Sequence, residues 1–462
     1  MRLVRTFSIV AALFFAPLLH PQDTRHVTEP AIPPPCVTLD AHLAADHGRL
    51  AADDESKLDT DRIQQALDHC SIGHSVVLRA RGANSAFLSG PTSLRTGVTL
   101  VIGKGATLFA SRDPTLYART SGSCGLVNQA PPGCRPLISV DHVTGAGVMG
   151  DGVIDGRGGD NLLGQKVTWW QLAEQARSGG HQQVFRVIVA KYSDNFTLYR
   201  ITLMNSPNFH VIYDHGDGFT VWGLKIDTPR RGARNTDGVD PGDGARNITI
   251  THSYIRDGDD NVALKGGDGG ITNVSIVHNH FYWGHGMSIG SETFGGVSKI
   301  RVEDLSLDGP DNGIRIKSNA SRGGLVEDVV YDNVCIRNSP NPLFFDTGYT
   351  AAGTLQGDRY PTYKDLTLRN VAISGGGKIS FNGYSADHRI GVNLDNVTVN
   401  ASEPYQYSIR HADFHIGPGP MNLTLLGEDS TVTGKVTAKA PAPDCSGMFV
   451  RFPAVTPAPV FR

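Results

Sequence analysis

Four short motifs between residues 235 and 317 collect side chains that can act as acids, bases and fixed cations. The motifs are Asn-Thr-Asp, Gly-Asp-Asp, Gly-His-Gly and Arg-Ile-Lys, and their reactive residues are Asp237, Asp259, Asp260, His285, Arg315 and Lys317. Carboxyl groups held close together repel one another, so at least one keeps its proton beside ionised neighbours. Such a pair can hydrolyse a glycosidic bond, because the acid protonates the leaving oxygen while the carboxylate activates water.

The three remaining side chains suit the same chemistry. His285 lies between two glycines and can hydrogen-bond the acid and tune its protonation. Arg315 and Lys317 are two residues apart on an expected strand, so their side chains share one face. Two cations beside an acid pair would clamp the carboxylate of an acidic sugar.

Each motif alone also has an ordinary structural explanation. Asn and Asp beside Gly form turns, a His between glycines fits a loop, and two cations on a strand fit a solvated edge. Order and spacing favour the chemical interpretation. Asp237 precedes Asp259 by 22 residues, and Asp260 precedes His285 by 25. His285 in turn precedes Arg315 by 30, so every step is close to one length of the repeat described next.

Alternating β-branched runs recur between about residue 140 and residue 400, each with a polar or Asn-led start. Examples are NFTLYRITL from Asn195, NITITHSYI from Asn247, NVSIVHNHF from Asn273 and KIRVEDLSL from Lys299, and most starts lie 23 to 29 residues apart. Period-two runs with Gly, Asn and Asp turns indicate strands, and this repeat length indicates stacked coils. The Leu framework of leucine-rich repeats is absent. The pattern therefore predicts an all-β parallel β-helix, whose stacked strands lie about 4.8 Å apart and align the reactive residues in a column.

The ends of the chain carry other signals. A charged start and the apolar run from Phe7 to Leu19 predict a signal peptide over residues 1–22, since the run is too short to cross a membrane. Residues 59–70 have one apolar helical face and predict an N-terminal helix that caps the solenoid behind an Asp-Thr start. We expect one catalytic domain over residues 23–462. Its Pro-rich tail, from about residue 438, is expected to lie irregularly on the opposite end of the solenoid.

Composition and cysteine usage narrow the class of protein. The chain has 39% hydrophobic and 19% charged residues and a net charge of −3, which indicates a globular protein that does not bind nucleic acid. Export would place the six cysteines in an oxidising compartment, where disulfides form. The candidates are Cys36, Cys70, Cys124, Cys134, Cys335 and Cys445. Cys124 and Cys134 bracket a loop that a disulfide could staple, while the pairing, and the alternative of free buried thiols, stay open.

In this order and at these intervals, the four motifs resemble the signature motifs of the polygalacturonases, glycoside hydrolases of family 28. The segments SPNFHV, GHGMSIGSET and IDGRGG followed by WWQLA are similar to the bacterial secreted endo-polygalacturonases, over roughly residues 55–400. The QQVFRVI strand approach and the glycine-rich GGDGGITN segment depart from that bacterial pattern. Both departures are expected to alter subsites and not the chemistry.

The resemblance implies a right-handed parallel β-helix that cleaves the α-1,4-D-galacturonosyl linkages of polygalacturonate, which is demethylated pectin. The implied mechanism inverts the anomeric centre and uses no metal and no cofactor. Asp259 would be the general acid, and Asp237 with Asp260 would hold and deprotonate the attacking water. His285 would support the protonation of the acid. Inversion implies a separation of roughly 6.5–9.5 Å between the acid and the base.

The resemblance also implies substrate contacts. Arg315 and Lys317 would bind the galacturonate carboxylate at the cleavage site, and Asn235, Asp240 and Tyr349 would be further contacts. Because this chain has little length beyond its repeats to close one end of a cleft, we expect endo action. We expect a secreted, extracellular monomer whose partner is the pectin polysaccharide, with no membrane contact after removal of the leader.

Other activities stay open at this point. An exo-polygalacturonase, or a hydrolase of rhamnogalacturonan or xylogalacturonan, would share the fold and most of the site. A pectate lyase would use the aspartates to hold Ca²⁺ and an arginine to abstract the C5 proton. A non-catalytic β-helix, such as an adhesin or a carbohydrate-binding surface, would keep the repeat without aligning three carboxylates, a His and two cations.

Overall fold

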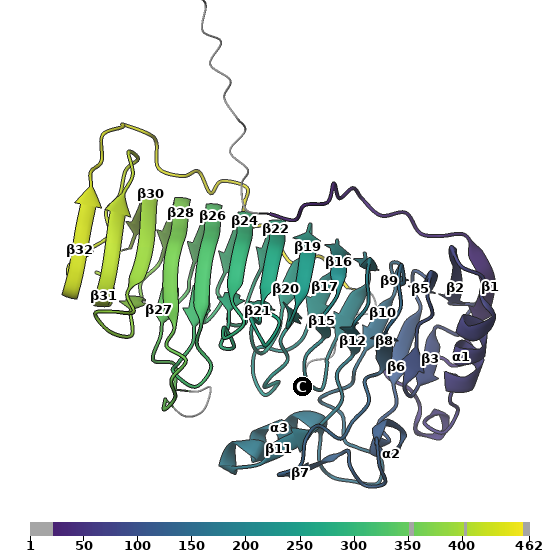
Figure 1. Ribbon diagram of the computed structural model, residues 1–462. Coiled ribbons are helices and arrows are strands. Elements are labelled where there is room, and N and C mark those ends of the chain that lie inside the picture. Colours follow the sequence, from purple (N-terminus) through teal and green to yellow (C-terminus); the bar gives the residue numbers. More distant parts are fainter. Residues whose placement is uncertain (1–21, 351–354, 402–403, 456–462) are drawn as a thin grey trace, which may run out of the picture.

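Parallel strands stacked into a long solenoid form the body of the protein (Figure 1). The computed structural model describes residues 22–350, 355–401 and 404–455. The predicted signal peptide, residues 1–22, therefore lies outside the described residues except for Gln22. Within the described part of the chain, no helix is long and apolar enough to cross a membrane.

The longest stack of strands forms one face of the solenoid. Its members, in order of pairing, are β1 (Pro35–Asp40), β2 (His74–Arg79), β5 (Val98–Ile102), β9 (Gly147–Met149), β13 (Phe196–Tyr199), β16 (Asp217–Trp222), β19 (Ala245–Thr251), β22 (Ile271–Phe281), β24 (Val297–Asp308), β26 (Leu325–Arg337), β28 (Thr362–Ser374), β30 (Ile390–Asn400), β31 (Gln406–Ile416) and β32 (Glu428–Gly434). A second, shorter stack joins this face at β22 and contains β3 (Ala86–Ser89), β6 (Thr107–Ala110), β10 (Val153–Asp155), β14 (Thr202–Met204), β17 (Lys225–Asp227) and β20 (Tyr254–Arg256).

A third stack, called the site stack below, carries the reactive motifs. It contains β4 (Thr92–Ser93), β8 (Ile138–Asp141), β12 (Ile188–Lys191), β15 (Val211–Asp214), β18 (Val239–Gly242), β21 (Val262–Leu264), β23 (Met287–Ile289), β25 (Asn312–Lys317), β27 (Asn341–Asp346) and β29 (Lys378–Asn382), and ends on β31. The pairing is parallel at every step, as the repeat predicted.

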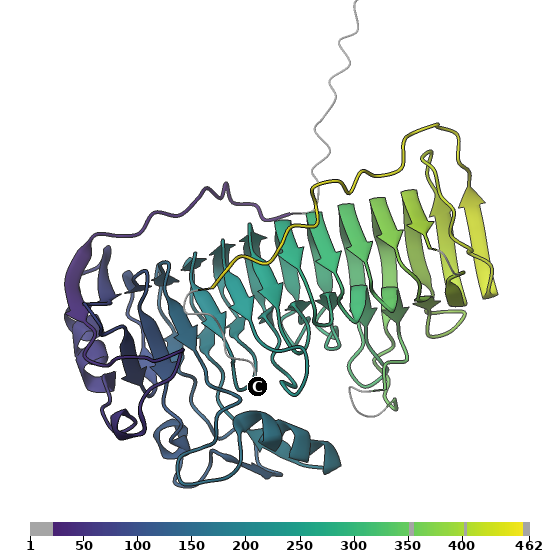
Figure 2. The same cartoon turned by 180° about the vertical axis from the view of Figure 1, so that it is seen from behind.

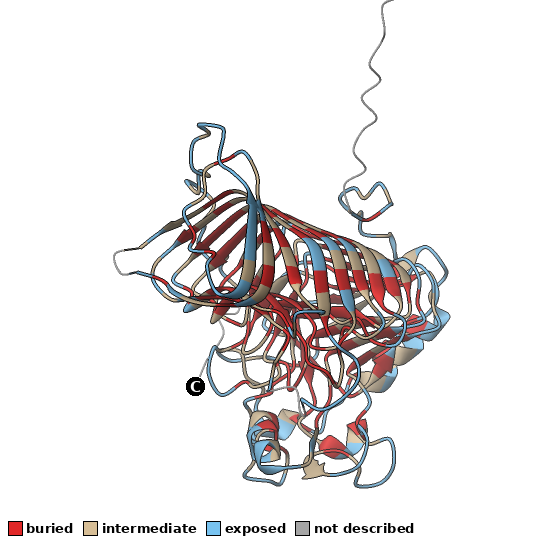
Figure 3. Cartoon of the chain, turned by 60° about the vertical axis from the view of Figure 1, so that its left-hand side comes forward, coloured by how far each residue is buried: buried red, intermediate tan, exposed pale blue. Residues whose placement is uncertain are grey.

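The Asn-led starts of the repeats form corners of the coils. Asn195, Asn247 and Asn273 all have a positive φ, between 53° and 59°, which Asn adopts more readily than most residues. Their side chains also stack, since the Asn273 amide donates to Asn247 Oδ1 at 3.2 Å. Apolar residues between the corners are buried along the solenoid (Figure 3) and form one continuous core. The polar corners and apolar runs together account for the repeat.

Helices and one small sheet decorate the N-terminal half. The described helices are α1 (Thr60–His69), α2 (Pro114–Tyr117) and α3 (Trp169–Gln175), with 3-10 turns η1 (Ala52–Asp54) and η2 (Ala176–Ser178). The antiparallel pair β7 (Leu126–Asn128) and β11 (His181–Gln183) joins α3 in a lobe beside the solenoid (Figure 1).

The predicted capping helix is α1, at the N-terminal end. Ile63 and Leu67 on its apolar face are fully buried. Asp59 occupies the N-cap position, but the expectation that it caps the helix is wrong, because its side chain makes no cap bond. The carboxylate instead accepts hydrogen bonds from Leu88 N and from Arg62.

The C-terminal tail corrects another expectation. It does not cover the far end of the solenoid but leads back along it (Figure 2). A disulfide joins Cys335 to Cys445, and the ring of Phe452 lies 5.3 Å from that of Tyr282. The segment after residue 434 contains no helix or strand up to residue 455.

Disulfides use all the candidate cysteines. The pairs are Cys36–Cys70, Cys124–Cys134 and Cys335–Cys445. No described cysteine is free, so the alternative of buried thiols is wrong. Division of the chain into a signal peptide and one domain stays a prediction.

Candidate active site

Asp237, Asp260 and His285 lie just before successive strands of the site stack, whereas Arg315 and Lys317 lie within the next strand, β25. Val239, Val262 and Met287 are paired in register across β18, β21 and β23. Asp237 and Asp260 each lie two residues before a paired valine, and His285 lies two before Met287. The sequence spacing suggested Asp259 as the partner of Asp237 in the column. The register instead aligns Asp260 with Asp237, and Asp259 lies one residue earlier in the bend.

Gly258 produces a bend in the backbone just before Asp259 and Asp260. A Cβ at this position would lie 2.1 Å from Ala233 O, so no other residue fits without a shift of backbone. The Gly258 amide donates to Thr236 Oγ1 at 3.0 Å, and the Asp259 amide donates to Asp257 Oδ1 at 3.1 Å. This turn therefore joins the Asn-Thr-Asp segment of one coil to the Gly-Asp-Asp segment of the next.

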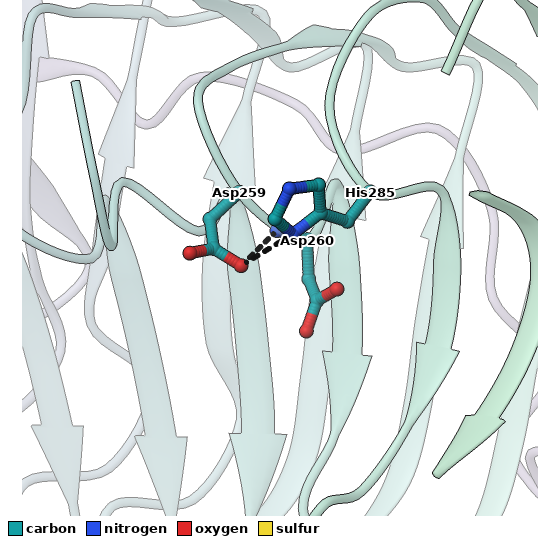
Figure 4. Close-up of side chains that lie close together, drawn as sticks. All are labelled: Asp259, Asp260 and His285. Carbon is teal, nitrogen blue, oxygen red and sulfur yellow. Dashed lines mark hydrogen bonds and ion pairs between the residues drawn. The ribbon is translucent and has the colours of Figure 1, made fainter. Parts of the chain in front are cut away.

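Asp259 and His285 form a hydrogen-bonded pair. His285 Nδ1 lies 2.9 Å from Asp259 Oδ1, and Figure 4 shows this carboxylate directed at the imidazole while Asp260 extends in another direction. Burial would raise the pKa of Asp259, but the hydrogen bond to His285 and the charges of His285 and Lys317 together hold that pKa below its usual value. Burial would lower the pKa of His285, but the hydrogen bond to Asp259 and the charges of Asp259 and Asp260 together raise it.

The protonation state of this pair departs from the simplest expectation. Repulsion was expected to leave one acid protonated, with Asp259 as the acid. In the free protein the proton of the Asp259–His285 pair instead resides on the imidazole, because each partner stabilises the charged form of the other. Of the three motif aspartates, Asp237 is the one whose pKa is raised, through burial and then repulsion from Asp240 and Asp259.

Asp260 is buried and held by three donors. Ser288 Oγ and Arg315 Nη1 donate to Oδ1 at 2.7 and 3.0 Å, and Lys317 Nζ donates to Oδ2 at 2.6 Å. Burial alone would raise the pKa of Asp260, but the charges of Lys317 and Arg315 hold it far below its usual range. Asp260 therefore favours its ionised form, and both of its oxygens accept hydrogen bonds.

Asp237 and Asp240 form a second buried carboxyl pair. Both side chains are 3–4% exposed, and Lys265 Nζ lies 3.7 Å from Asp237 Oδ2 and 3.6 Å from Asp240 Oδ2. Burial raises the pKa of Asp240 to about 7, against the opposing charge of Lys265. Asp240 was expected to contact substrate. The structure places it beside Asp237 and does not include it among the residues that line the cavity described below.

The remaining predicted contacts surround the same site. The Arg315 guanidinium lies 5.2 Å from the centre of the Tyr349 ring, and its Nη2 donates to Tyr349 Oη at 3.2 Å. Lys317 and Tyr349 line the cavity, whereas Arg315 reaches it only through these partners. Asn235 lies at the edge, where its Oδ1 accepts a hydrogen bond from Gln182 of β11.

A cavity of about 720 Å³ is lined by Asp237, Asp259, Asp260, His285 and Lys317, among other residues. Seven cationic and five acidic side chains line it, in addition to His285. The cations are Arg177, Arg230, Arg231, Arg234, Lys265, Lys317 and Arg322. The acids are Glu174, Asp237, Asp259, Asp260 and Glu292. The three motif aspartates therefore lie in surroundings that favour an anionic ligand.

The hollow continues past Asn235. A neighbouring cavity of about 350 Å³ shares Phe209, Arg234 and Asn235 with the first and extends along β11. Its far side includes His181 and Gln182 of that strand. A ligand longer than one sugar could therefore pass the carboxylates and reach the lobe.

The comparisons with known proteins agree with this geometry. The family described as "Glycosyl hydrolases family 28" matches residues 83–414, which include every reactive residue named above. The chain belongs to this family. It is thus a glycoside hydrolase, and the resemblance drawn from the four motifs is confirmed.

Relatives of this family 28 hydrolase carry more specific names. An "Endo-polygalacturonase" of Pectobacterium parmentieri is 43% identical over 83% of this chain and 91% of its own length. A "Polygalacturonase" of Ralstonia nicotianae is 37% identical over 94% of this chain and 93% of its own. The solved polygalacturonase of Erwinia carotovora ssp. carotovora is 41% identical, covers 85% of this chain and 99% of its own, and superposes with a TM-score of 0.77. The right-handed parallel β-helix is confirmed.

Most of the charged cavity lining was missed from the sequence, as were Lys265, Ser288 and Asp257, which surround the reactive carboxyl groups. Lys265 follows a short apolar strand, a position at which the sequence predicts a solvated lysine at the strand end. Ser288 pairs with Arg315 in the strand register, so a register-based search from Arg315 could have found it. Asp257 is fully buried and accepts the hydrogen bond from the Asp259 amide. In the sequence it cannot be distinguished from an ordinary turn aspartate.

Proposed function

We propose that this protein hydrolyses the α-1,4-D-galacturonosyl linkages of polygalacturonate, with inversion and without a metal, and that it cuts within the chain. The observation that carries the proposal is the alignment of Asp237, Asp260 and His285 on neighbouring strands, with Arg315 and Lys317 on the next strand. Membership of family 28 and the names of its relatives support the same substrate.

The proposed reaction is a single displacement. The water oxygen attacks C1 of a galacturonate while an oxygen of Asp237 takes the water proton. The bond from C1 to the bridging oxygen breaks, and that oxygen receives a proton from Asp259. Asp237 suits the base because it lines the cavity beside Asp259 and Asp260. Asp260, with its oxygens engaged, contributes negative charge and holds the water.

The general acid receives its proton from His285. In the free protein that proton lies on the imidazole of the Asp259–His285 pair. A galacturonate carboxylate bound near Lys317 and Arg315 would offset the positive charge that favours ionised Asp259. The pKa of Asp259 then rises, and the proton moves across the 2.9 Å hydrogen bond to the carboxylate that faces the leaving oxygen. The separation of 6.5–9.5 Å expected for inversion stays a prediction.

The cavity supports both the substrate and the endo action. Its excess of cations suits a polymer with one carboxylate on every sugar. The adjoining hollow along β11 offers room for sugars beyond the cleavage site. The engagement of Asp260 by Lys317 and Arg315 argues against a calcium-dependent lyase, because two cations already neutralise the carboxylate that Ca²⁺ would need.

We further propose that the enzyme is a secreted monomer. The disulfides fit an oxidising compartment, and the net charge of −3 fits a protein without a nucleic-acid partner. The mass of the native protein in solution tests the monomeric state. Recovery of the protein from the culture medium, with sequencing of its N-terminus, tests secretion.

One assay tests the proposed reaction. Purified protein is mixed with polygalacturonate and excess EDTA, and reducing ends, absorbance of unsaturated uronides and viscosity are followed together. We expect reducing ends to rise without new absorbance while viscosity collapses early. Absorbance that EDTA abolishes would indicate a lyase, and a slow fall in viscosity would indicate exo action. Activity only on rhamnogalacturonan or xylogalacturonan would replace the substrate.

A further inference from the structure

Lys265 occupies a position that the reaction described above does not use. It follows β21, and its backbone is held on both sides by the preceding coil: Lys265 N donates to Pro241 O at 3.0 Å, and Asp243 N donates to Lys265 O at 3.0 Å. The side chain reaches between Asp237 and Asp240 at 3.7 and 3.6 Å. Its ammonium group therefore lies almost equally far from two buried carboxyl groups.

The two carboxyl groups have few other partners. Apart from the hydrogen bond between the two carboxyl groups, Asp237 Oδ1 and both side-chain oxygens of Asp240 have no hydrogen-bond partner among the described residues. One cation faces two acids, so a single positive charge offsets only one negative charge. The second charge would stay uncompensated in a buried site, and such a pair avoids that cost by holding one proton between its members.

We propose that Lys265 is a positioning residue that limits the Asp237–Asp240 pair to one proton, so that Asp237 can present an ionised oxygen to the attacking water. Burial raises the pKa of both carboxyl groups, so the pair shares this proton. In the reacting form Asp240 carries the proton and Asp237 is ionised. The inference rests on the proposed role of Asp237 in hydrolysis. Without Lys265 the pair would bind a second proton at neutral pH, and the base would be lost.

Other charged groups also face the pair. They are Asp259 and Asp260 from the turn before β21, and Arg186 from the segment before β12. Glu292, in the segment after β23, raises the pKa of Lys265 through its negative charge. His210 meets the backbone of Asp237 through Nδ1, and burial lowers its pKa to about 4, so it is neutral in the working range. Among these groups Lys265 is the cation that lies within ion-pair distance of both carboxylates.

The test is the pH dependence of kcat/KM on polygalacturonate for four proteins: wild type, Lys265→Met, Asp240→Asn and the double variant. Met keeps the length of the side chain against Phe209 and removes the charge. We expect Lys265→Met to move the acid limb upward by at least one pH unit, about tenfold in kcat/KM on that limb. Asp240→Asn alone should move it downward, and the double variant should return it toward wild type, because removal of the second acid removes the need for the cation.

The outcomes separate the two proposals. An equal loss of activity by Lys265→Met at every pH, without rescue by Asp240→Asn, would mean a structural role and overturn this inference. Should Lys265→Met fail to fold, an unshifted acid limb in Asp240→Asn would overturn it equally. A wild-type protein that releases no reducing ends would instead refute the proposed hydrolysis itself. Lys265→Arg, which keeps the charge, serves as the matched control and should retain the wild-type profile.

Discussion

Asp259 is the side chain through which the proton of His285 must pass to reach the leaving oxygen. Asp259→Asn keeps the size and polarity of this residue but cannot deliver that proton. General acid–base groups contribute about 10²–10⁴-fold to rate, so we expect kcat to fall by that factor with little change in KM. Steady-state kinetics on polygalacturonate checks this. Asp268→Asn, the same change on an exposed aspartate of the glycine-rich loop, is the control and should leave kcat unchanged.

The Asp259–His285 pair also determines a pH limit. Because the pKa of His285 is raised above 6.5, the proton is present below that raised pKa and is lost as the pH increases through it. We therefore expect the basic limb of kcat/KM, which reports the free enzyme, to lie above pH 6.5. In His285→Gln the acid must hold the proton alone, so the limb should move to lower pH. A limb in the same place in both proteins would contradict the assignment.

At the scale of elements, the turn before β21 positions both Asp259 and Asp260, and its close approach to the preceding coil depends on Gly258. Gly258→Ala would place a Cβ 2.1 Å from Ala233 O and push the turn out of register with the preceding coil. We expect kcat to fall at least tenfold, since a displacement of about 1 Å can cost 10²-fold, while the circular dichroism of the solenoid is retained. Gly376→Ala is the matched control, because no atom lies within 4 Å of its added Cβ. Similar activities in both variants would contradict the role of this turn.

The elements were predictable from the sequence where the pattern is periodic. Alternation and the repeat length place Asp237, Asp260 and His285 near one another, because strand pairing transfers a sequence interval into a neighbouring position. The choice between Asp259 and Asp260 was not predictable, since it depends on the bend at Gly258. Lys265 was missed for a similar reason: its role arises from the distance to acids on the previous coil and leaves no mark in its own segment.

At the scale of the molecule, the N-terminal segment of residues 23–29 crosses the coils on the face formed by the longest stack of strands. Asp23 N donates to Ser275 Oγ, and Thr249 Oγ1 donates to Asp23 Oδ2 at 2.7 Å, over sequence separations of 252 and 226. Glu29 accepts a hydrogen bond from Tyr199 Oη at 2.6 Å. These strands, β22, β19 and β13, belong to the longest stack and not to the site stack. No periodic signal predicts such contacts, because single side chains make them across most of the chain.

This segment should stabilise the solenoid without affecting catalysis. Asp23 is 5% exposed and forms an ion pair with Arg25 at 2.7 Å, so Asp23→Ala leaves Thr249 Oγ1 without its acceptor and removes the ion pair of Arg25. Loss of a buried charged acceptor costs about 1–3 kcal/mol, and we expect the thermal midpoint to fall by a few degrees while kcat and KM stay at wild-type values. Asp46→Ala, at a side chain that is 96% exposed, is the control and should change neither. An equal midpoint in the two variants would mean that the segment only lies on the surface, whereas a fall in kcat would mean that the long-strand face and the site stack are coupled through the core.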